Sequence, residues 1–574
     1  MTIHKKDVIQ HLETIAMYME LKGENSFKIG AFRKAAISLD KDERGLKEIL
    51  DFTSIPNIGK GTAAIIEEFI QTGQSETLLS LMEEVPNGLI PLLQLQGLGG
   101  KKIAKLYQEL NITNLDELRQ ACEERNVRNL SGFGEKTEEK ILNEIKKMGQ
   151  KPDRLPISYM LSIANWVETY LNNFPEIIQF SRAGSLRRYR ETIKDLDFII
   201  STNHREKVKD YILSLDKITE VIASGPTKVS CIFSFDYEVS VDFRMVTEEE
   251  FATTLHHFTG SKEHNVRMRQ IAKERGEKIS EYGVENVETG EIKHFLNEEQ
   301  FFNHFQLPFI SPELREDGSE LDRLNELEDL VDLKDMKGDL HIHTTWSDGA
   351  HTLEEMIEAA RRKGYEYIAI TDHSQYLKVA NGLTVDRLLK QNEEIAKLNE
   401  QYKDITILSG VEMDILPDGT LDYPDDVLKE LDIVIAAIHS SFYQDENMIM
   451  KRLQTACEHP YVNIIAHPTG RILGRREGYS VNVEEFLQIA LKTNTVVELN
   501  ANPNRLDLSY EALKKAKELG VKIVINTDSH HVDELNFMEI GTKVARKGWY
   551  HSRNVINTYS LKELINMLKS KREK

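Results

Sequence analysis

The stretch AGSLRRYRETIKDLDF (183–198) decides the fold of the central part of this 574-residue chain. It places the pair Gly184-Ser185 ahead of Asp195 and Asp197, and the two aspartates alternate with apolar residues. Residues i and i+2 of a β-strand share one face. We therefore expect a strand whose two carboxylates lie on its polar face, while its apolar side chains enter the core of an α+β domain.

A second stretch, EVSVDFRMV (238–246), shows the same alternation and carries Asp242 on its polar side. If the two strands are neighbours, the carboxylates of Asp195, Asp197 and Asp242 converge, and such a cluster is stable only when cations neutralise it. Hard oxygen ligands suit Mg²⁺ or Mn²⁺. Two such ions, roughly 3.5–4 Å apart, would hold the attacking and the leaving oxygen of a phosphoryl displacement.

Groups that bind a triphosphate are expected next to these carboxylates. The backbone of Gly184-Ser185 can cradle the phosphates, and Arg182, Arg187 and Arg188 can neutralise them. A lone Asp-x-Asp pair is usually an ordinary surface feature. The combination of Gly-Ser, Asp-x-Asp and a later strand aspartate is much more specific, because it is the signature of nucleotidyltransferases.

Three glycine-containing turns near the N-terminus resemble one another: SIPNIGKGTAAII (54–66), QLQGLGGKKIAKLY (94–107) and LSGFGEKTEEKIL (130–142). Each leads into an amphipathic helical pattern, so they form an internal repeat. Helix–hairpin–helix turns present free backbone N–H groups to a DNA phosphate. This mode suits a chain whose net charge of −21 argues against broad electrostatic binding of nucleic acid. Plain helix caps are the alternative. The expected DNA-binding residues are Gly59, Lys60, Gly61, Gly97, Gly99, Lys101, Lys102, Gly132 and Gly134.

From residue 338 on, seven apolar runs alternate with helical segments. This pattern is typical of a parallel sheet covered by helices, and seven units predict a distorted β/α barrel. Potential metal ligands stand where the runs stop, which is where barrel enzymes place their chemistry. These residues are His341, His343, Asp348, His373, Glu412, His439, His467, Asp528 and His530.

The mixture of imidazole and carboxylate in this set suits Mn²⁺, Zn²⁺ or Fe²⁺. The set is larger than one ion needs, so two or three ions are expected. A single buried histidine is usually structural, but ligands at several strand ends in register are not expected by chance. Such a cluster lowers the pKa of a bound water and holds a phosphate.

Residues 1–312 resemble the family X DNA polymerases, the gap-filling repair type, with a lyase-like helical domain, hairpins, a palm and a thumb. The resemblance implies that Asp195, Asp197 and Asp242 are the catalytic residues and bind the two metal ions, and that the aspartate on the second strand also takes the proton of the primer hydroxyl. The stretch HHFTGSKEHNVRMR (256–269) is similar to the nucleotide-binding thumb motif of that family. It implies nucleotide-binding roles for Phe258, Thr259, Gly260, Asn265 and Arg269.

The chain departs from the family pattern at three positions. His257 stands where the thumb motif usually has tyrosine, and Lys262 stands where animal members have an acidic residue. Sugar discrimination and nucleotide affinity are therefore expected to differ. Ile65 stands at the position of the family's Schiff-base lysine. A lyase needs an amine nucleophile, so we expect no deoxyribose-phosphate lyase activity of the usual kind.

The motifs HIHTTWSDG, TDHS, GVEMD, AIHS, AHP and NTDSH resemble the polymerase-and-histidinol-phosphatase (PHP) domain over residues 338–574, with its nine ligand positions all occupied. The resemblance implies a phosphoesterase with three metal ions. Fused to a repair polymerase, such a domain is expected to act as a 3′→5′ exonuclease that also processes 3′ ends. Cleavage at abasic sites stays open as a further activity.

The expected fold is multidomain: a helical N-terminal region with helix–hairpin–helix motifs, an α+β nucleotidyltransferase palm and thumb, and a C-terminal distorted seven-stranded barrel. The expected boundaries are 1–85 for the lyase-like domain, 86–150 for the fingers, 151–245 for the palm, 246–312 for the thumb, 313–337 for an acidic linker and 338–574 for the PHP domain.

The expected partners are gapped or primer–template DNA and dNTPs, with no membrane and a monomeric chain. Three scattered cysteines fit a reducing cytoplasm. Two other interpretations remain. The palm could belong to a template-independent nucleotidyltransferase fused to a small-molecule phosphatase, or the PHP domain could serve only as a structural module.

Overall fold

The computed structural model describes residues 3–573 apart from residues 4, 41, 43, 45, 47, 48, 96, 97 and 149–151. The chain forms two compact units, Met1–Pro152 and Asp153–Lys574. The first unit has a hydrophobic core of its own. In the part of the chain that is described, none of the helices has the length and apolar character needed to cross a membrane.

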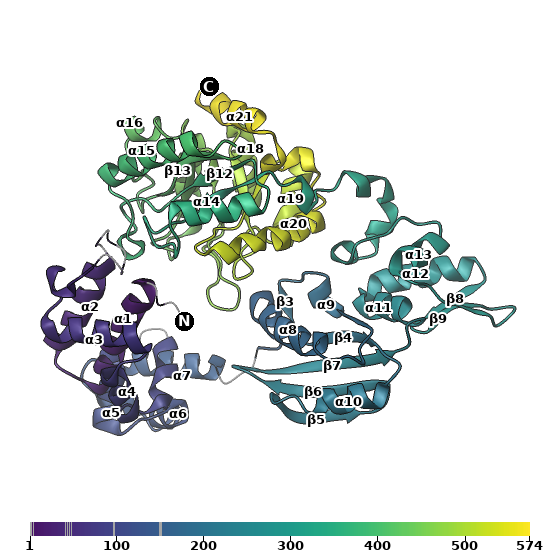
Figure 1. Ribbon diagram of the computed structural model, residues 1–574, viewed down its shortest axis with the longest axis horizontal. Coiled ribbons are helices and arrows are strands. Elements are labelled where there is room, and N and C mark those ends of the chain that lie inside the picture. The colour runs from purple at the N-terminus through teal and green to yellow at the C-terminus, as the bar shows by residue number, and fades with distance from the viewer. Residues whose placement is uncertain are drawn as a thin grey trace. The chain divides into compact units, whose positions relative to one another are not determined.

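The first unit is helical, as predicted (Figure 1). Its longest helix, α1, buries Val8, Leu12 and Ile15 completely, at the i, i+4, i+7 spacing of one helix face. The α-helices are α1 (Lys5–Lys22), α2 (Ser26–Asp40), α3 (Lys60–Thr72), α4 (Glu76–Glu84), α5 (Gly100–Leu110), α6 (Leu115–Glu123) and α7 (Glu135–Met148). Short 3₁₀ helices are η1 (Phe52–Ser54), η2 (Asn87–Gln94) and η3 (Val127–Asn129).

The second unit begins with a five-stranded sheet in the order β2-β4-β7-β6-β5. Strands β4 and β7 are parallel neighbours, while the other pairs are antiparallel. The stacked rings of Phe198 and Phe243 lie in the core beneath them. The elements are β1 (Leu155–Pro156), α8 (Ile157–Asn172), β2 (Gln179–Arg182), α9 (Gly184–Arg187), β3 (Thr192–Ile193), β4 (Leu196–Ser201), α10 (Arg205–Leu213), β5 (Ile218–Ser224), β6 (Lys228–Ser234) and β7 (Glu238–Val246).

A smaller helical layer with a three-stranded sheet follows the palm sheet. Its elements are α11 (Phe251–Thr259), α12 (Lys262–Glu274), β8 (Glu277–Ser280), β9 (Gly283–Asn286), β10 (Ile292–Lys293) and α13 (Glu298–His304). The acidic segment after it contains η4 (Pro312–Leu314), η5 (Ser319–Asp322), η6 (Leu324–Asp329) and η7 (Leu333–Asp335). This segment packs more tightly than its composition suggests, because Leu314 and Leu321 join the core of the layer.

The C-terminal part is a seven-stranded parallel sheet in the order β11 to β17, as predicted. A bridge between Ile342 and Ser529 brings the first strand to the chain just beyond the last, so the barrel is nearly closed. Its strands are β11 (Gly338–Ile342), β12 (Tyr367–Ile370), β13 (Thr406–Asp414), β14 (Ile433–Ala437), β15 (Ile464–Ile465), β16 (Val496–Asn500) and β17 (Ile523–Asn526).

Helices cover the barrel, and Figure 1 shows them around the strands. They are α14 (Leu353–Arg362), α15 (Val385–Gln401), α16 (Asp425–Leu428), α17 (Glu446–Glu458), α18 (Val483–Thr493), α19 (Tyr510–Leu519), α20 (Phe537–Lys547) and α21 (Leu561–Arg572), with η8 (Lys378–Ala380), η9 (Val532–Asn536), η10 (Ser552–Asn554) and η11 (Ile556–Thr558).

Candidate active sites

The palm sheet brings the three predicted carboxylates together. The register of β4 against β7 places Asp197 directly opposite Asp242, and Asp195 immediately precedes β4. Burial, followed by repulsion from Asp195 and Asp242, raises the pKa of Asp197 to about 7. The ammonium group of Lys228 lies 2.8 Å from a carboxylate oxygen of Asp242. A site that raises a carboxyl pKa in this way is built to bind cations, so the residues fit the predicted divalent ions.

Only glycine fits at position 184, because the carboxylate of Asp197 lies close to its backbone. Its φ of +61° lies in the left-handed region. A Cβ atom at this position would also lie only 2.4 Å from Oδ2 of Asp197. The glycine of the Gly-Ser pair therefore leaves room for the central carboxylate, and Ser185 lines an adjoining pocket.

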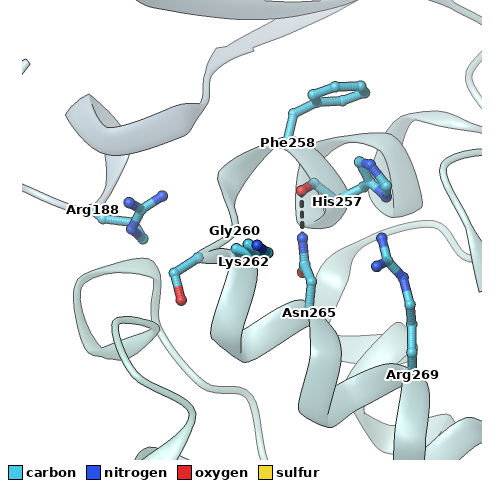
Figure 2. A pocket seen from close by; sticks show the side chains of 8 residues that line it. Arg188, His257, Phe258, Gly260, Lys262, Asn265 and Arg269 are labelled. Carbon is cyan, nitrogen blue, oxygen red and sulfur yellow. Dashed lines mark hydrogen bonds between the residues drawn. The ribbon is translucent and has the colours of Figure 1, made fainter. Parts of the chain in front are cut away.

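A pocket of about 360 Å³ lies between α11, α12 and Arg188, the residue that follows α9. Figure 2 shows the side chains that line it. The amide of Asn265 donates a hydrogen bond of 2.8 Å to the backbone oxygen of His257 and ties the two helices together at its wall. The residues that line it are Arg188, His257, Phe258, Gly260, Ser261, Lys262, Asn265 and Arg269. Most of the residues predicted from the thumb motif thus face one cavity.

An adjoining pocket of about 470 Å³ shares Arg188, Ser261 and Lys262 with the first and reaches Ser185 and Asp195. It also contains Arg154, Arg190 and Lys194, which the sequence motifs did not single out. The two pockets together connect the thumb motif with Asp195 through a lining in which cationic side chains outnumber acidic ones, although Glu316 pairs with Arg188 and Arg190. This is the charge that a triphosphate needs, in a chain with a net charge of −21.

Two of the predicted nucleotide-binding residues, Arg187 and Thr259, point into the protein interior rather than into the pockets. Arg187 donates to the hydroxyl of Thr259 at 2.7 Å and to the carboxylate of the buried Glu298 at 2.6 Å. Neither Arg187 nor Thr259 lines the pockets. The structure therefore places this pair behind the pocket wall, where it joins α9, α11 and α13.

The three hairpins lead into helices, as their sequence pattern predicts. Gly59 and Gly99 are the N-cap residues of α3 and α5, and neither helix start has a capping side chain. A Cβ atom at Gly59, Gly61, Gly99, Gly132 or Gly134 would meet open space. The backbone at these turns is therefore accessible. Lys60 and Lys101 are exposed beside it, Lys102 lies over the ring of Phe133, and Gly97 lies outside the described residues.

Replacing both Gly59 and Gly99 with leucine should weaken the binding of duplex DNA by at least about tenfold, since hydrogen bonds to charged groups contribute about 1.5–3 kcal/mol each. Neither position has a positive φ and both have open space, so the fold should be retained. Fluorescence anisotropy with a labelled gapped duplex measures the effect. Gly30→Leu, at another open glycine on α2, is the matched control. Equal affinity of the double variant and the control would refute hairpin binding.

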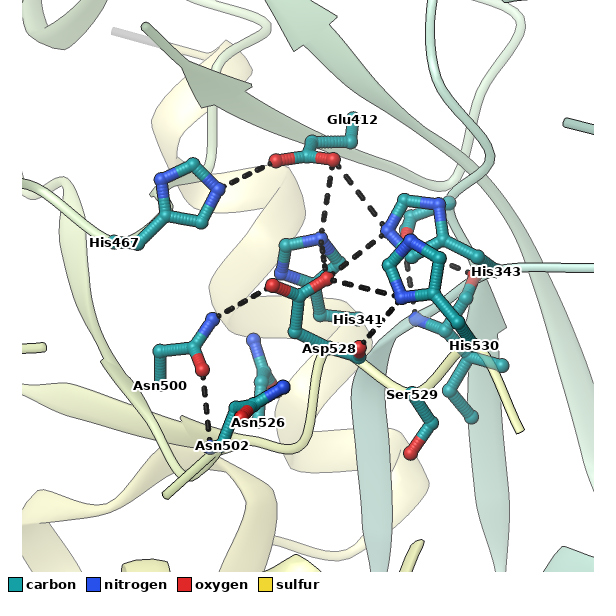
Figure 3. A network of polar contacts seen from close by, with 12 residues as sticks. His341, His343, Glu412, His467, Asn500, Asn502, Asn526, Asp528, Ser529 and His530 are labelled. Carbon is teal, nitrogen blue, oxygen red and sulfur yellow. Dashed lines mark hydrogen bonds and ion pairs between the residues drawn. The ribbon is translucent and has the colours of Figure 1, made fainter. Parts of the chain in front are cut away.

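The mouth of the barrel brings all nine predicted ligands into one cluster. Figure 3 labels six of them: His341, His343, Glu412, His467, Asp528 and His530. Eight of them form three overlapping groups whose ligand atoms lie within 4.8 Å of one another: His343, Asp348, His373 and His530; His341, His343, Glu412 and Asp528; and His373, Glu412 and His439. The ninth, His467, places its Nε2 atom 2.8 Å from Glu412. Glu412 stands at the centre because it belongs to two groups and contacts this ninth ligand.

The geometry of these contacts fits metal ions better than hydrogen bonds. Within the described part of the chain, buried atoms without a hydrogen-bond partner include Nε2 of His341, both ring nitrogens of His343, Nδ1 of His373 and Oε2 of Glu412. Nδ1 of His373 lies 2.9 Å from Glu412 without the alignment of a hydrogen bond. Lone pairs that converge on common points, rather than on N–H donors, indicate bound cations.

Outer residues orient the ligands. Nδ1 of His341 lies 2.7 Å from Oε2 of the buried Glu498, and Nδ1 of His439 lies 3.2 Å from Asp414. The amide of Asn500 bonds to both Glu498 and Asp528. A carboxylate behind a histidine fixes its tautomer and leaves Nε2 for the metal. Sequence reasoning missed Glu498 and Asp414, although Glu498 lies inside TVVELNA (495–501), the one of the seven apolar runs to which no ligand was assigned.

Charges in the cluster are strongly coupled. Burial, followed by repulsion from His530 and His373, lowers the pKa of His343 to about 3. Burial also opposes protonation of His439, but Glu412 and Asp414 outweigh it and raise its pKa to about 10. The carboxylates therefore attract positive charge into a buried space, which is the electrostatic setting of a multinuclear cation site.

Comparisons with known proteins match the parts of the chain separately. A helix-hairpin-helix domain matches residues 3–75, and a SAM-like helix-hairpin-helix tandem matches residues 89–147. The DNA polymerase beta thumb matches residues 254–316, and the PHP domain matches residues 339–502. These matches fall on the helical unit, the pocket-bearing layer and the barrel.

Curated relatives include whole-chain and partial matches. A probable phosphatase of Thermoanaerobacter sp. (strain X514) is 32% identical over 41% of this chain and 96% of its own length. A probable phosphatase of Caldicellulosiruptor bescii is 28% identical over 40% of this chain and 94% of its own length. DNA polymerase/3′-5′ exonuclease PolX of Bacillus subtilis (strain 168) is 60% identical over 99% of this chain and 100% of its own length. The chain therefore belongs to the PolX family, as a family X DNA polymerase with a 3′–5′ exonuclease PHP domain.

Proposed function

We propose that the polymerase part fills short gaps in DNA during base excision repair and that Asp195, Asp197 and Asp242 hold two Mg²⁺ or Mn²⁺ ions. The observation that carries this proposal is the register that sets Asp197 opposite Asp242. Two bound ions would neutralise the attacking and leaving oxygens of the transfer. We assign to Asp242 the acceptance of the primer hydroxyl proton, and to Arg188 and Lys262, shared by both pockets, the binding of the triphosphate.

The remaining pocket residues receive the nucleoside in this proposal. Phe258, Gly260, Asn265 and Arg269 line the cavity of Figure 2. The exposed backbone of the hairpins takes phosphates of the DNA without regard to sequence. No lyase step is included, because Ile65 offers no amine.

We propose that the barrel holds two or three Mn²⁺, Zn²⁺ or Fe²⁺ ions through its nine clustered side chains. Such ions would lower the pKa of a bound water and polarise a phosphodiester. The residues of the chain fix the ions and exclude bulk water, since most of the ligands are buried. The site would then remove 3′ nucleotides and blocked 3′ ends, and cleave at abasic sites.

A comparison of DNA substrates tests both proposals. The chain should extend a one-nucleotide gap in DNA in preference to a single-stranded RNA end, and degrade 3′ ends with Mn²⁺ when dNTPs are withheld. Template-independent addition of nucleotides would favour the other nucleotidyltransferase interpretation. Because partial relatives are named as probable phosphatases, hydrolysis of a 3′-phosphate on DNA should be measured against hydrolysis of small phosphomonoesters. A strong preference for the small esters would refute a DNA-directed barrel site.

Removal of metal should destabilise the barrel selectively. Ions that bind only the folded state at a thousand times their Kd contribute about 4 kcal/mol, which corresponds to about 10 °C in the Tm of a domain of this size. Scanning calorimetry with EDTA and with Mn²⁺ measures the shift. The transition of the helical unit is the internal control and should not move. Identical thermograms in both conditions would contradict ion binding by the cluster.

We further propose a cytoplasmic, monomeric protein whose partners are gapped or primer–template DNA and dNTPs. The three cysteines support a reducing compartment, because all of them are buried thiols without disulfide partners among the described residues. Size-exclusion chromatography with light scattering tests the monomer.

A further inference from the structure

A buried hydrogen-bonded chain lies directly behind the wall of the nucleotide pocket. Nε2 of His256 on α11 lies 3.0 Å from Nε2 of His264 on α12. Nδ1 of His264 lies 2.6 Å from Oε1 of Glu320 in η5. All three side chains are buried, at 1%, 0% and 0% exposure. Two histidines and a carboxylate taken out of water need a reason beyond packing, because apolar residues fill such space at lower cost.

These residues alternate with the pocket wall along the chain. His256 precedes His257, and His264 precedes Asn265, so each buried member is the direct neighbour of a residue that lines the pocket. The pocket members are joined by the hydrogen bond from Asn265 to the backbone of His257, which is drawn in Figure 2. The two helices are therefore connected twice, by one hydrogen bond at the pocket and by one histidine pair behind it.

Glu320 determines which ring nitrogen of each histidine in this hydrogen-bonded series carries the proton. When Glu320 is ionised, it accepts the Nδ1–H of His264, and this fixes the tautomer of that ring. Nε2 of His264 is then unprotonated and accepts a hydrogen bond from Nε2–H of His256. Burial lowers the pKa of both histidines, and Arg315 lowers both further, while Glu320 opposes the shift at His264. The two hydrogen bonds require neutral imidazole rings, because each ring must offer one donor and one acceptor nitrogen.

Without the carboxylate of Glu320, the donor and acceptor roles of the two histidines would no longer be fixed. Nδ1 of His256 and Oε2 of Glu320 have no hydrogen-bond partner among the residues that the structure describes. Without Glu320, both tautomers of His264 become available, and the contact with His256 is no longer fixed. The connection between α11 and α12 would then rest on the hydrogen bond from Asn265 to the backbone of His257.

We propose that His264 and Glu320 are positioning residues for the nucleotide pocket, acting through His256 and Asn265. The proposal rests on the assignment of that pocket to the incoming dNTP. It gives the segment after the thumb a role in polymerisation, since Glu320 belongs to η5 rather than to the thumb helices.

Substitutions of equal size at position 320 separate positioning from folding. Glu320→Gln keeps an acceptor for Nδ1–H, whereas Glu320→Met removes it. On a one-nucleotide gap, Glu320→Met should raise the KM for dNTP about tenfold, the factor expected for one lost buried hydrogen bond, with kcat within about twofold. Glu320→Gln should stay within about threefold of the wild-type KM. His264→Phe should behave like Glu320→Met.

An exposed ion pair between the same two elements supplies the matched control. Arg267 of α12 lies 2.8 Å from Asp322 of η5, and the Asp322 side chain is 63% exposed. Asp322→Asn should leave both kinetic constants unchanged, because exposed pairs contribute little. Exonuclease activity on single-stranded DNA should stay at the wild-type level in every variant, and this verifies that the barrel is folded.

The outcomes distinguish failure of the positioning role from failure of the assignment of the pocket to the dNTP. An unchanged KM in Glu320→Met, with or without a lower Tm, would overturn the positioning role and leave a purely structural one. An equal rise in KM in Glu320→Gln and Glu320→Met would also overturn it, because the acceptor would then be irrelevant. If the wild-type chain shows no dNTP-dependent extension, it is the assignment of the pocket that fails.

Discussion

Replacing Asp197 with asparagine is expected to lower kcat for nucleotide incorporation by about a thousandfold. Asp197 is central to the carboxylate cluster, because Asp195 precedes it by two residues and Asp242 lies opposite it in the sheet. The amide keeps the shape of the side chain but loses the charge that would hold both ions. Metal-ion stabilisation of a transition state is worth several kcal/mol, and about 4 kcal/mol corresponds to three orders of magnitude.

Single-turnover extension on gapped DNA measures this effect, with exonuclease activity recorded on the same preparation. Asp210→Asn is the matched control, because Asp210 is an exposed aspartate on α10 of the same domain. Both variants should degrade 3′ ends at the wild-type rate. Incorporation by Asp197→Asn at more than about a tenth of the wild-type rate would show that the catalytic ions are held elsewhere.

The sequence was most informative where one side-chain period holds over a whole element. Alternation in 195–198 and 238–246 predicted which faces of two strands are buried, and their pairing then brought the aspartates together. The apolar runs after residue 338 predicted the parallel barrel and the end of the barrel at which the nine candidate ligands lie. In both cases the local pattern determines which face of a strand is buried, and the pairing of the strands determines which polar side chains come together.

Contacts between distant segments could not be predicted in the same way. The segment 313–337 reads as an acidic linker, yet Glu313 is buried against Arg546, and Arg315 is buried against Glu298. Composition shows the charges but not the opposite charges that fold against them from far along the chain. The inward direction of Arg187 has the same cause, because its partner Glu298 lies in another element.

Exonuclease activity should fall by about a thousandfold when His343 is replaced with alanine, while polymerisation is retained. His343 belongs to two of the three ligand groups, so it lies where these groups overlap. Its pKa of about 3 keeps the ring neutral and its lone pair available at every pH used for assays. Raising the pH should not recover the activity of His343→Ala, because alanine offers no ligand atom at any pH.

Metal content separates the loss of ions from the loss of a proton-transfer group. Elemental analysis after dialysis should show fewer bound ions per chain in His343→Ala than in the wild type. His459→Ala is the matched control, because His459 lies in the same domain and its ring is hydrogen-bonded only to the exposed Asp425 and to the backbone of Tyr461 among the described residues. Full metal content together with lost exonuclease activity would mean that His343 acts on the substrate rather than on the ions. Persistent 3′ degradation would place the nuclease site outside the barrel mouth. The expected result is the joint loss of ions and activity, because the buried Nε2 atom of this histidine lies 3.4 Å from a carboxylate oxygen of Glu412 and 3.2 Å from one of Asp528.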